Sequence, residues 1–226
     1  MARTIIDQLG IDTLVFDGFG TLFDLESATP AFEQVAPGQG LEILRWWRAK
    51  QLQYTKRCIL TRRYRNLWVL MEQAMEDACL RFHLDISHAK RKELCEQYLK
   101  LKVFDEVPEV LSKLREKYKL VILSHGTQSM LDSVTTHNQI THLFDAILSV
   151  DTVQAYKPEL RAYELITQTI NLPERAFGYV GVNPMDIAGA RAFGMKAIWL
   201  IRQDPKNRLM EFVAHFVINE LKALSD

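Results

Sequence analysis

Short, mostly apolar runs that alternate with helical segments constrain the fold of this 226-residue chain more than any other feature. Each run is bounded by turn residues, as expected of a strand that is buried on both faces of a sheet. The segments between the later runs carry apolar residues at helical spacing. Strands that alternate with helices predict an α/β fold with a parallel, doubly wound sheet. The predicted strands are residues 14–16, 120–123, 146–150, 177–180, 197–201 and, at the edge, 215–218.

A long stretch without a strand pattern separates the first run from the second. Its apolar residues recur at helical spacing in three places, 41–54, 67–82 and 94–101. We therefore predict two parts. Residues 1–24 and 102–226 form a Rossmann-like core, and residues 25–101 form a helical insertion. At the C-terminal end, Asn219 is predicted to cap a short helix.

The first run ends at Asp17, and Gly18 and Gly20 follow it closely. Glycine adopts backbone angles that are closed to other residues, so the chain can turn sharply here beside free main-chain N–H groups. Ligands of parallel α/β sheets bind beyond the carboxyl ends of the strands, where Asp17 would lie. The pattern fits a nucleophilic or metal-binding carboxylate. Taken alone, it fits equally well an Asp that merely caps a turn.

Polar side chains also follow three later strands. A lone lysine before a proline is usually a solvated surface residue, and Asn183 could simply cap the helix that follows it. Four polar strand ends in this order, however, favour an active site at the carboxyl edge of one sheet. The four groups are Asp17 with Thr21, Ser124 with His125, Lys157 with Tyr163, and Asn183 with Asp186.

The composition argues against several classes of protein. Lys+Arg and Asp+Glu both number 28, and a zero net charge argues against a nucleic-acid partner. The sequence shows neither an apolar run of membrane-spanning length nor a signal-peptide core, so we expect no membrane partner. Cys58, Cys79 and Cys95 fall in helical pattern without metal-ligand spacing and are expected to be buried, free thiols. These features predict a cytoplasmic protein. A homodimer is left open.

The ordered motifs resemble those of the haloacid dehalogenase superfamily. They are Phe-Asp-x-x-Gly-Thr-Leu at 16–22, the strand end at Ser124, Lys157-Pro158, and Asn183-x-x-Asp186. Within the superfamily the chain is most similar to the L-2-haloacid dehalogenases, and the likeness spans nearly its whole length. The resemblance implies that the helical insertion is a cap domain over Asp17. The additional matching strings are Phe-Asp at 23–24, Trp-Arg-Ala-Lys-Gln-Leu at 47–52, Tyr-Lys-Pro at 156–158 with Tyr163, and Gly-Ala-Arg-Ala-Phe-Gly at 189–194.

The resemblance implies metal-independent, cofactor-free hydrolysis of small 2-haloalkanoic acids to 2-hydroxy acids and halide. Asp17 would attack carbon 2 of the substrate and form an ester, while Lys157 keeps Asp17 ionised. Asp186 would orient Lys157 and assist the hydrolytic water. Arg48, on a cap helix, would receive the halide. Thr21 and Asn183 complete the implied catalytic set, and the implied substrate-binding residues are Gly18, Phe19, Ser124, His125, Arg48, Leu52, Tyr163 and Met185.

One position separates the chain from the phosphatases of the superfamily. These generally carry a second Asp two positions after the nucleophile, where this chain has Phe19. The remaining acids, Asp17 and Asp186 beside Lys157, make a poor magnesium site. A halide needs no proton when it leaves, so dehalogenation does not suffer. A phosphatase with an unusual metal site remains an alternative. So does a weakly active relative that binds a small carboxylate.

Four positions also depart from the L-2-haloacid dehalogenase pattern. His125 stands where the family has a halide-binding Asn, Gly181 where it has a serine, and Phe19 and Met185 where it has aromatic residues. Phe19 and Met185 are expected to keep the pocket apolar. A protonated His125 would donate a strong hydrogen bond, so we hypothesise a cradle that favours fluoride and works better as the pH falls toward about 6.5. The alternative is that His125 blocks the site. The physiological substrate and the halide preference stay open.

Overall fold

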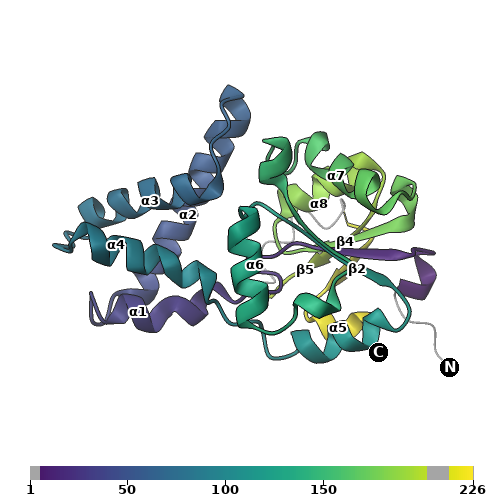
Figure 1. The fold of residues 1–226 in the computed structure, drawn as a ribbon, viewed down its shortest axis with the longest axis horizontal. Coiled ribbons are helices and arrows are strands. Elements are labelled where there is room, and N and C mark those ends of the chain that lie inside the picture. The colour runs from purple at the N-terminus through teal and green to yellow at the C-terminus, as the bar shows by residue number, and fades with distance from the viewer. Residues whose placement is uncertain (1–5, 203–213, 226) are drawn as a thin grey trace.

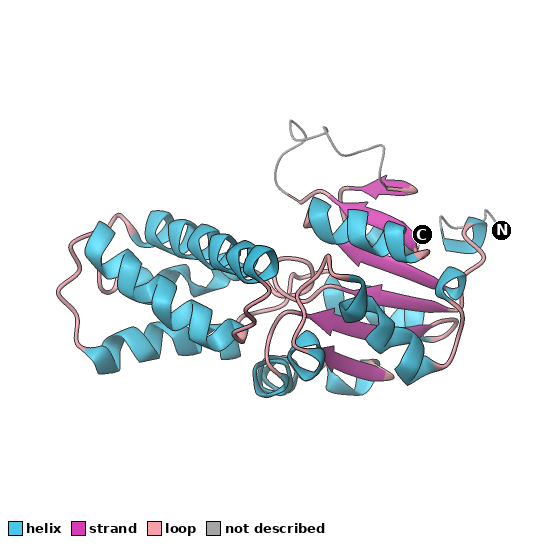
Figure 2. Ribbon diagram, turned by 90° about the horizontal axis from the view of Figure 1, so that it is seen from above, coloured by secondary structure: helices cyan, strands magenta, loops and turns pink. Residues whose placement is uncertain are grey.

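The computed structural model describes residues 6–202 and 214–225 and shows two parts side by side (Figure 1). One part consists of helices, and the other holds a sheet with helices on both faces (Figure 2). The chain enters the second part through a 3-10 helix, Ile6–Gln8. The first five residues of the predicted N-terminal lead-in lie outside the described residues.

A six-stranded parallel sheet, in the order β3-β2-β1-β4-β5-β6, forms the centre of the larger part. Strand β1 lies in the middle and pairs with β2 on one side and β4 on the other. The strand order therefore reverses at β1, which is where open α/β sheets bind their ligands. The strands are β1 Thr13–Phe16, β2 Lys119–Ser124, β3 Ala146–Ser149, β4 Phe177–Gly181, β5 Lys196–Leu200 and β6 Phe216–Ile218.

Helices cover both faces of this sheet, which explains why its central strands are apolar throughout rather than alternating. Leu14 and Phe16 of β1 share one hydrophobic cluster with the helices of the first face, and Val15 belongs to the cluster of the opposite face. The predicted doubly wound parallel sheet is thus confirmed. The helices are α5 Val107–Arg115 and α6 Gln128–His137 on the first face, and α7 Leu160–Ile170 and α8 Pro184–Phe193 on the second.

The described elements between the first and second strands are all helical. Trp47 lies fully buried among them, and its Nε1 donates a hydrogen bond to the carbonyl oxygen of Met71 at 2.9 Å. Asn66 and Ser87 cap two of the helices through their side chains. The elements are a 3-10 helix Leu25–Ala28, α1 Thr29–Glu33, α2 Gly40–Thr61, α3 Leu67–Arg81, α4 His88–Cys95 and a 3-10 helix Glu96–Leu99.

The chain enters and leaves this helical part at one place. The main-chain N–H of Asp24 donates to the carbonyl oxygen of Lys102 at 2.7 Å, and the N–H of Phe104 donates to that of Leu22 at 3.1 Å. The two connecting segments therefore lie side by side, next to the glycine turn after β1.

Some details differ from the sequence-based expectations. The last helix is a 3-10 helix, Leu221–Leu224, which begins after Glu220, so the prediction that Asn219 caps it is wrong. All three cysteines are free, but Cys79 is only half-buried, whereas Cys58 and Cys95 are buried. Within the described ranges, no helix has the length and apolar character needed to cross a membrane.

Candidate active site

Asp17 directly follows β1 and is held by its neighbours on both sides. Its main-chain N–H donates to the carbonyl oxygen of Val180 at 2.9 Å, which keeps it in line with β4. The Thr21 hydroxyl donates to Asp17 Oδ2 at 3.1 Å and accepts the N–H of Val182 at 3.2 Å. Gly20, with φ of 90°, makes the turn that brings Thr21 back. The carboxylate is therefore fixed at the strand end and almost entirely buried.

Lys157 supplies the opposite charge. Its Nζ lies 2.7 Å from Asp17 Oδ1 and 3.0 Å from Asp186 Oδ2, and it also donates to the carbonyl oxygen of Leu123 at 3.0 Å. Burial lowers the pKa of Lys157, but the two carboxylates outweigh burial, so this pKa lies above its ordinary value. The side chain is thus a permanent cation between two acids.

Asp186 lies in the first turn of α8 and presents one oxygen to Lys157. Its other oxygen, Oδ1, is buried and has no hydrogen-bond partner among the described residues. Helix α8 approaches the Lys157 segment closely at Gly189, where a Cβ atom would lie 2.6 Å from that of Pro158. A larger residue at 189 would push Asp186 away from Lys157.

The turn after Asp17 offers main-chain donors. Neither the N–H of Gly18 nor that of Phe19 has a hydrogen-bond acceptor within the described part of the chain. The Ser124 hydroxyl lies beside this turn, since a Cβ atom on Gly18 would stand 3.1 Å from Ser124 Oγ. Two amides and a hydroxyl next to a cation form a site suited to an anion.

A cavity of about 260 Å³ lies over these groups, and the helical part forms one side of its lining. The core contributes Asp17, Phe19, Gly20, Ser124, His125, Val182, Asn183, Pro184 and Asp186, and the helical part contributes Leu25, Arg48, Leu52 and Leu67. A second cavity of about 410 Å³ shares Arg48 and Leu25 with the first and extends outward between the two parts. The size of the inner cavity suits a small molecule.

Arg48 brings a second cation to this cavity from α2. It is half-buried, and it forms none of the ion pairs found among the described residues. The Tyr98 ring packs against Phe19, with centroids 5.1 Å apart, which joins the helical part to the glycine turn. Arg48 therefore lines the same cavity as Asp17, from the side of the helical part.

A family model described as haloacid dehalogenase-like hydrolase matches residues 43–200 of the chain. The chain belongs to this family. It is 41% identical over 193 residues to the (S)-2-haloacid dehalogenase of Pseudomonas sp. (strain YL), covering 85% of this chain and 83% of that protein. It is 35% identical over 198 residues to haloacetate dehalogenase H-2 of Moraxella sp. (strain B), covering 85% and 86%.

The fold is also shared with a solved haloacid dehalogenase that carries a bound substrate. The L-2-haloacid dehalogenase of Xanthobacter autotrophicus, with chloropropionic acid covalently bound, superposes with a TM-score of 0.88 at 26% identity. The match covers 95% of this chain and 97% of that one. The resemblance drawn from the sequence motifs is thereby confirmed.

Magnesium, which phosphatases of the haloacid dehalogenase superfamily bind, does not fit between these acids. Lys157 Nζ lies within 3.0 Å of both Asp17 and Asp186 and takes the position that a bridging cation would need. Among the described residues, no three His, Cys, Asp or Glu side chains gather as metal ligands. The acid–lysine–acid arrangement supplies its own positive charge.

The protonation state of His125 differs from the one expected from the sequence. Its Nε2 accepts the main-chain N–H of Lys157 at 3.0 Å, so the proton of the neutral ring resides on Nδ1. Burial and the nearby Lys157 ammonium hold the pKa of His125 well below its ordinary value. The expectation of a protonated ring that assists halide release as the pH falls is therefore not supported. The ring still lines the cavity, as expected.

Two expected substrate-binding residues lie outside the cavity. Tyr163 is fully buried between α7 and α8, and its hydroxyl donates to the main-chain oxygen of Asp186 at 2.7 Å. Met185 is 46% exposed on the outer side of the first turn of α8, so it does not line the pocket. Asn183 does line the cavity, but its Oδ1 also caps α8 by accepting the N–H of Met185 at 3.0 Å.

One residue that contacts both Lys157 and Asp186 was not identified from the sequence. The Tyr179 hydroxyl of β4 lies 2.7 Å from Lys157 Nζ and 3.4 Å from Asp186 Oδ2. In the sequence it stands within an apolar strand and shows no sign of a polar role. The only hint is that Gly181 follows two positions later and therefore lies on the same face of the strand.

Proposed function

We propose that this protein is a hydrolytic dehalogenase of small 2-haloacids, such as haloacetates and 2-halopropionates, which acts through an ester on Asp17. The observation that carries the proposal is the cavity lined by both Asp17, which is paired with Lys157 at 2.7 Å, and Arg48. The family membership and the names of the similar proteins support the same substrate class.

In the first step, an Asp17 carboxylate oxygen forms a bond to carbon 2 of the substrate while the carbon–halogen bond breaks. The halide leaves with the bonding electron pair, and no proton is required. Lys157 donates a hydrogen bond to one oxygen of Asp17, and Thr21 donates one to the other. The N–H groups of Gly18 and Phe19, with Ser124, hold the substrate carboxylate. Arg48 receives the halide.

In the second step, water attacks the carbonyl carbon of the Asp17 ester. The ester bond breaks, the 2-hydroxy acid leaves, and the Asp17 carboxylate is regenerated. Asp186 lines the cavity, and its buried Oδ1 has no hydrogen-bond partner among the described residues, so this oxygen can accept the proton of the water. The net reaction consumes one water and releases halide and one proton.

The helical part serves as the cap in this proposal, with residues 1–24 and 102–226 as the core and 25–101 as the cap. Arg48, Leu52 and Leu67 close the cavity from the cap side, so chemistry requires the cap to be in place, which excludes bulk water. A cytoplasmic location, suggested by three free thiols, and a homodimer stay predictions.

A single turnover in heavy-oxygen water tests the ester directly. With protein in excess over bromoacetate, the first turnover should leave the heavy oxygen in the peptide that contains Asp17 and not in the glycolate product. Mass spectrometry of the digested protein and of the product measures both. Label that appears directly in the first-turnover product contradicts the proposal.

Chelator treatment of the same enzyme tests the metal-free mechanism. Halide release should be unchanged after incubation with chelator, because Lys157 occupies the cation position. A loss that magnesium restores would instead support the phosphatase alternative. Haloacetate that stabilises the fold but is never turned over would support the weakly active relative.

A further inference from the structure

Tyr179 links Lys157, which pairs with Asp17, to Asp186, which acts in the second step. Its hydroxyl accepts a hydrogen bond from Lys157 Nζ at 2.7 Å and donates its own proton to Asp186 Oδ2 at 3.4 Å. Burial and the nearby carboxylates of Asp186 and Asp17 raise the pKa of Tyr179 well above its ordinary value, so the phenol is neutral and keeps this proton. The hydroxyl therefore bridges the cation and the acid.

Gly181 gives the Tyr179 ring its place. A Cβ atom at position 181 would lie 3.1 Å from Tyr179 Cε1 and 3.4 Å from Asp17 Cβ. Any side chain there would press the tyrosine ring away from the strand or crowd the nucleophile. The family pattern has a serine at this position, whereas this chain has Gly181. The hydroxyl that lies beside Lys157 in this chain is that of Tyr179.

We propose that Tyr179, in the space left by Gly181, is a positioning residue that orients the Asp186 carboxylate toward the hydrolytic water. This inference rests on the proposed ester mechanism. Two groups hold Asp186 Oδ2, namely Lys157 at 3.0 Å and Tyr179 at 3.4 Å, and together they fix the rotation of the carboxylate. The rotation in turn decides where the unpartnered Oδ1 points.

The two chemical steps depend on Tyr179 to different extents. Without the hydroxyl, Lys157 still has three acceptors for its three protons, namely Asp17, Asp186 and the Leu123 carbonyl oxygen, so Asp17 keeps its counter-charge. Asp186, in contrast, loses its only neutral side-chain donor among the described residues and one of the two groups that restrain its rotation. Ester hydrolysis therefore needs the tyrosine hydroxyl, whereas ester formation does not.

Single-turnover measurement of both steps tests the inference, with Tyr179→Phe as the variant. Rapid quenching followed by mass spectrometry of the intact protein counts the ester, and halide release times its formation. We expect ester hydrolysis to slow by about tenfold to a hundredfold, so that ester accumulates. Ester formation should stay within about threefold of the wild-type rate.

Tyr163→Phe is the matched control, because it also removes a buried phenolic hydroxyl beside Asp186. That hydroxyl bonds to the main-chain oxygen of Asp186 and not to its carboxylate. The ratio of the two rates should therefore stay as in the wild type. Gly181→Ala, which crowds the Tyr179 ring without removing its hydroxyl, should shift the ratio in the same direction as Tyr179→Phe. The inference is overturned if Tyr179→Phe slows both steps equally, or if Tyr163→Phe shifts the ratio of the two rates as much as Tyr179→Phe does.

A readout independent of turnover separates this inference from the mechanism on which it rests. The buried Lys157 ammonium should give a protected proton–nitrogen NMR signal. Tyr179→Phe removes one of its four partners, so the signal should shift and exchange faster with water, while Tyr163→Phe should leave it unchanged. An unchanged signal in Tyr179→Phe overturns the positioning role. A wild-type protein that never forms the ester overturns the proposed function instead.

Discussion

The two cations of the active site differ in how completely the protein neutralises them. Lys157 comes from the core, is buried, and lies between two carboxylates. Arg48 comes from the cap, is half-buried, and forms no ion pair with any described carboxylate. The charge of Lys157 is therefore compensated by carboxylates before substrate arrives, with one negative charge in excess, whereas the charge of Arg48 is compensated only when an anion enters.

This difference assigns separate tasks to the two parts. A buried ion pair that loses one partner leaves a charge without compensation, so the Lys157 centre matters for folding as well as chemistry. Arg48 is only partly buried and keeps contact with solvent, so its charge costs little in the empty protein. In the proposed mechanism, the fold preorganises Asp17 as the nucleophile, and the helical part supplies Arg48, which acts only when substrate is bound.

Removal of the core cation should have the largest effect. Lys157→Met leaves Asp17 and Asp186 buried and unpaired, so we expect a loss of about 3–5 kcal/mol in the free energy of unfolding and no halide release. Because the pKa of Lys157 is raised above 10.5, its contribution is fully present below pH 10.5 and is lost only as the pH rises through the raised value. Urea unfolding at pH 7.5 and halide release measure both effects.

A double variant serves as the control for this prediction. Asp17→Asn combined with Lys157→Met removes one of the stranded carboxylates, so it should be more stable than Lys157→Met alone. If Lys157→Met is as stable as the wild type, Lys157 is not needed to compensate the two buried carboxylates.

Removal of the cap cation should affect activity without affecting the fold. Arg48→Ala should reduce halide release by about a hundredfold or more, because a charge that stabilises the departing halide is lost. The free energy of unfolding should stay within about 0.5 kcal/mol of the wild type. Arg45→Ala is the matched control on the same helix, since Arg45 is exposed and paired with Glu26 at 2.7 Å. Near-normal turnover in Arg48→Ala would exclude Arg48 from the site.

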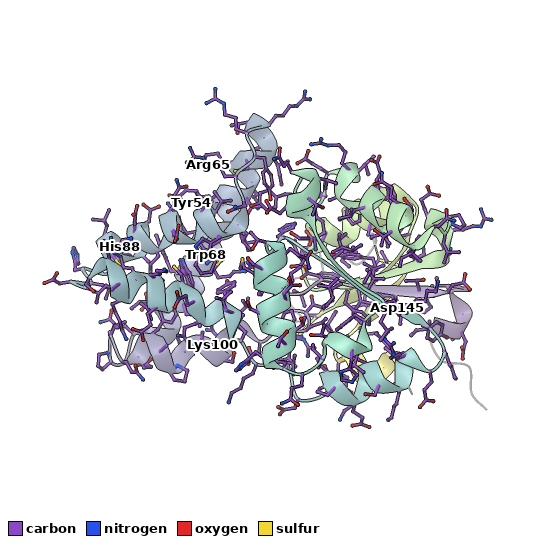
Figure 3. The ribbon with its side chains drawn as sticks, in the orientation of Figure 1. Tyr54, Arg65, Trp68, His88, Lys100 and Asp145 are labelled. Atoms are coloured by element: carbon purple, nitrogen blue, oxygen red, sulfur yellow. The ribbon has the colours of Figure 1, made fainter. Side chains whose placement is uncertain are left out.

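The contact between cap and core allows a milder test. The α2–α3 connection, in which Figure 3 labels Arg65, binds the core through three interactions. Tyr64 donates to Asp151 at 2.8 Å, the Tyr156 hydroxyl donates to the Arg65 carbonyl oxygen at 2.7 Å, and the two tyrosine rings lie 5.1 Å apart. Tyr156 directly precedes Lys157, so this contact links the end of α2 to the catalytic centre.

Tyr64→Phe removes one hydrogen bond of this contact and keeps the ring. We expect a loss of about 1 kcal/mol in the free energy of unfolding and a reduction of halide release by about threefold to tenfold, because Arg48 is less firmly placed. Tyr118→Phe, a surface tyrosine of the core that bonds to Asp7, is the comparison. A loss of stability with unchanged halide release would show that the contact serves folding only.

His125 should give the smallest effect, visible mainly in acid. The pKa of His125 in the folded protein is well below about 6.5. As the pH drops, this side chain therefore binds a proton in the unfolded chain but stays neutral in the folded protein. The free energy of unfolding should therefore fall below pH 6.5 by up to about 1.4 kcal/mol per pH unit. His125→Asn should flatten this slope, whereas replacement of the exposed His142 should not. Urea unfolding at pH 7.5, 6.5 and 5.5 measures the slope.

The same variant tests the fluoride hypothesis in its corrected form, with a neutral Nδ1–H as donor. Wild type should release fluoride from fluoroacetate better, relative to chloroacetate and bromoacetate, than His125→Asn does. The ratio should not improve as the pH falls. An equal gain of the Asn variant on all three substrates would contradict the hypothesis and favour a blocked site.

The sheet and the charged centre could be predicted from the sequence because both leave local signals in it. Apolar runs between turn residues marked the strands, and Asp17, Lys157 and Asp186 each follow a strand, which brings them to one edge. The structure joins these three side chains within 3.0 Å. Arg48 and Leu52 were placed through the family string, and the structure puts both in the cavity wall.

The remaining errors arise where the direction of a side chain decides its role. Met185 and Asp186 are adjacent in one helical turn, yet one points outward and the other into the cavity. Tyr163 and Tyr179 are both buried tyrosines, and only packing decides that the second reaches Lys157. The state of His125 depends on a main-chain N–H from a segment 32 residues away. None of these relations has a local signature.

The two connecting segments, joined by the main-chain hydrogen bonds Asp24–Lys102 and Phe104–Leu22, make the cap an exchangeable module. Because the chain leaves and re-enters the core at one point, a helical block of another size could be spliced between the same residues without altering the order of the sheet. The nucleophile and its lysine would stay as they are, while the roof of the cavity would change. Substrate range in such proteins can therefore diversify by replacement of the cap while the core side of the cavity stays the same.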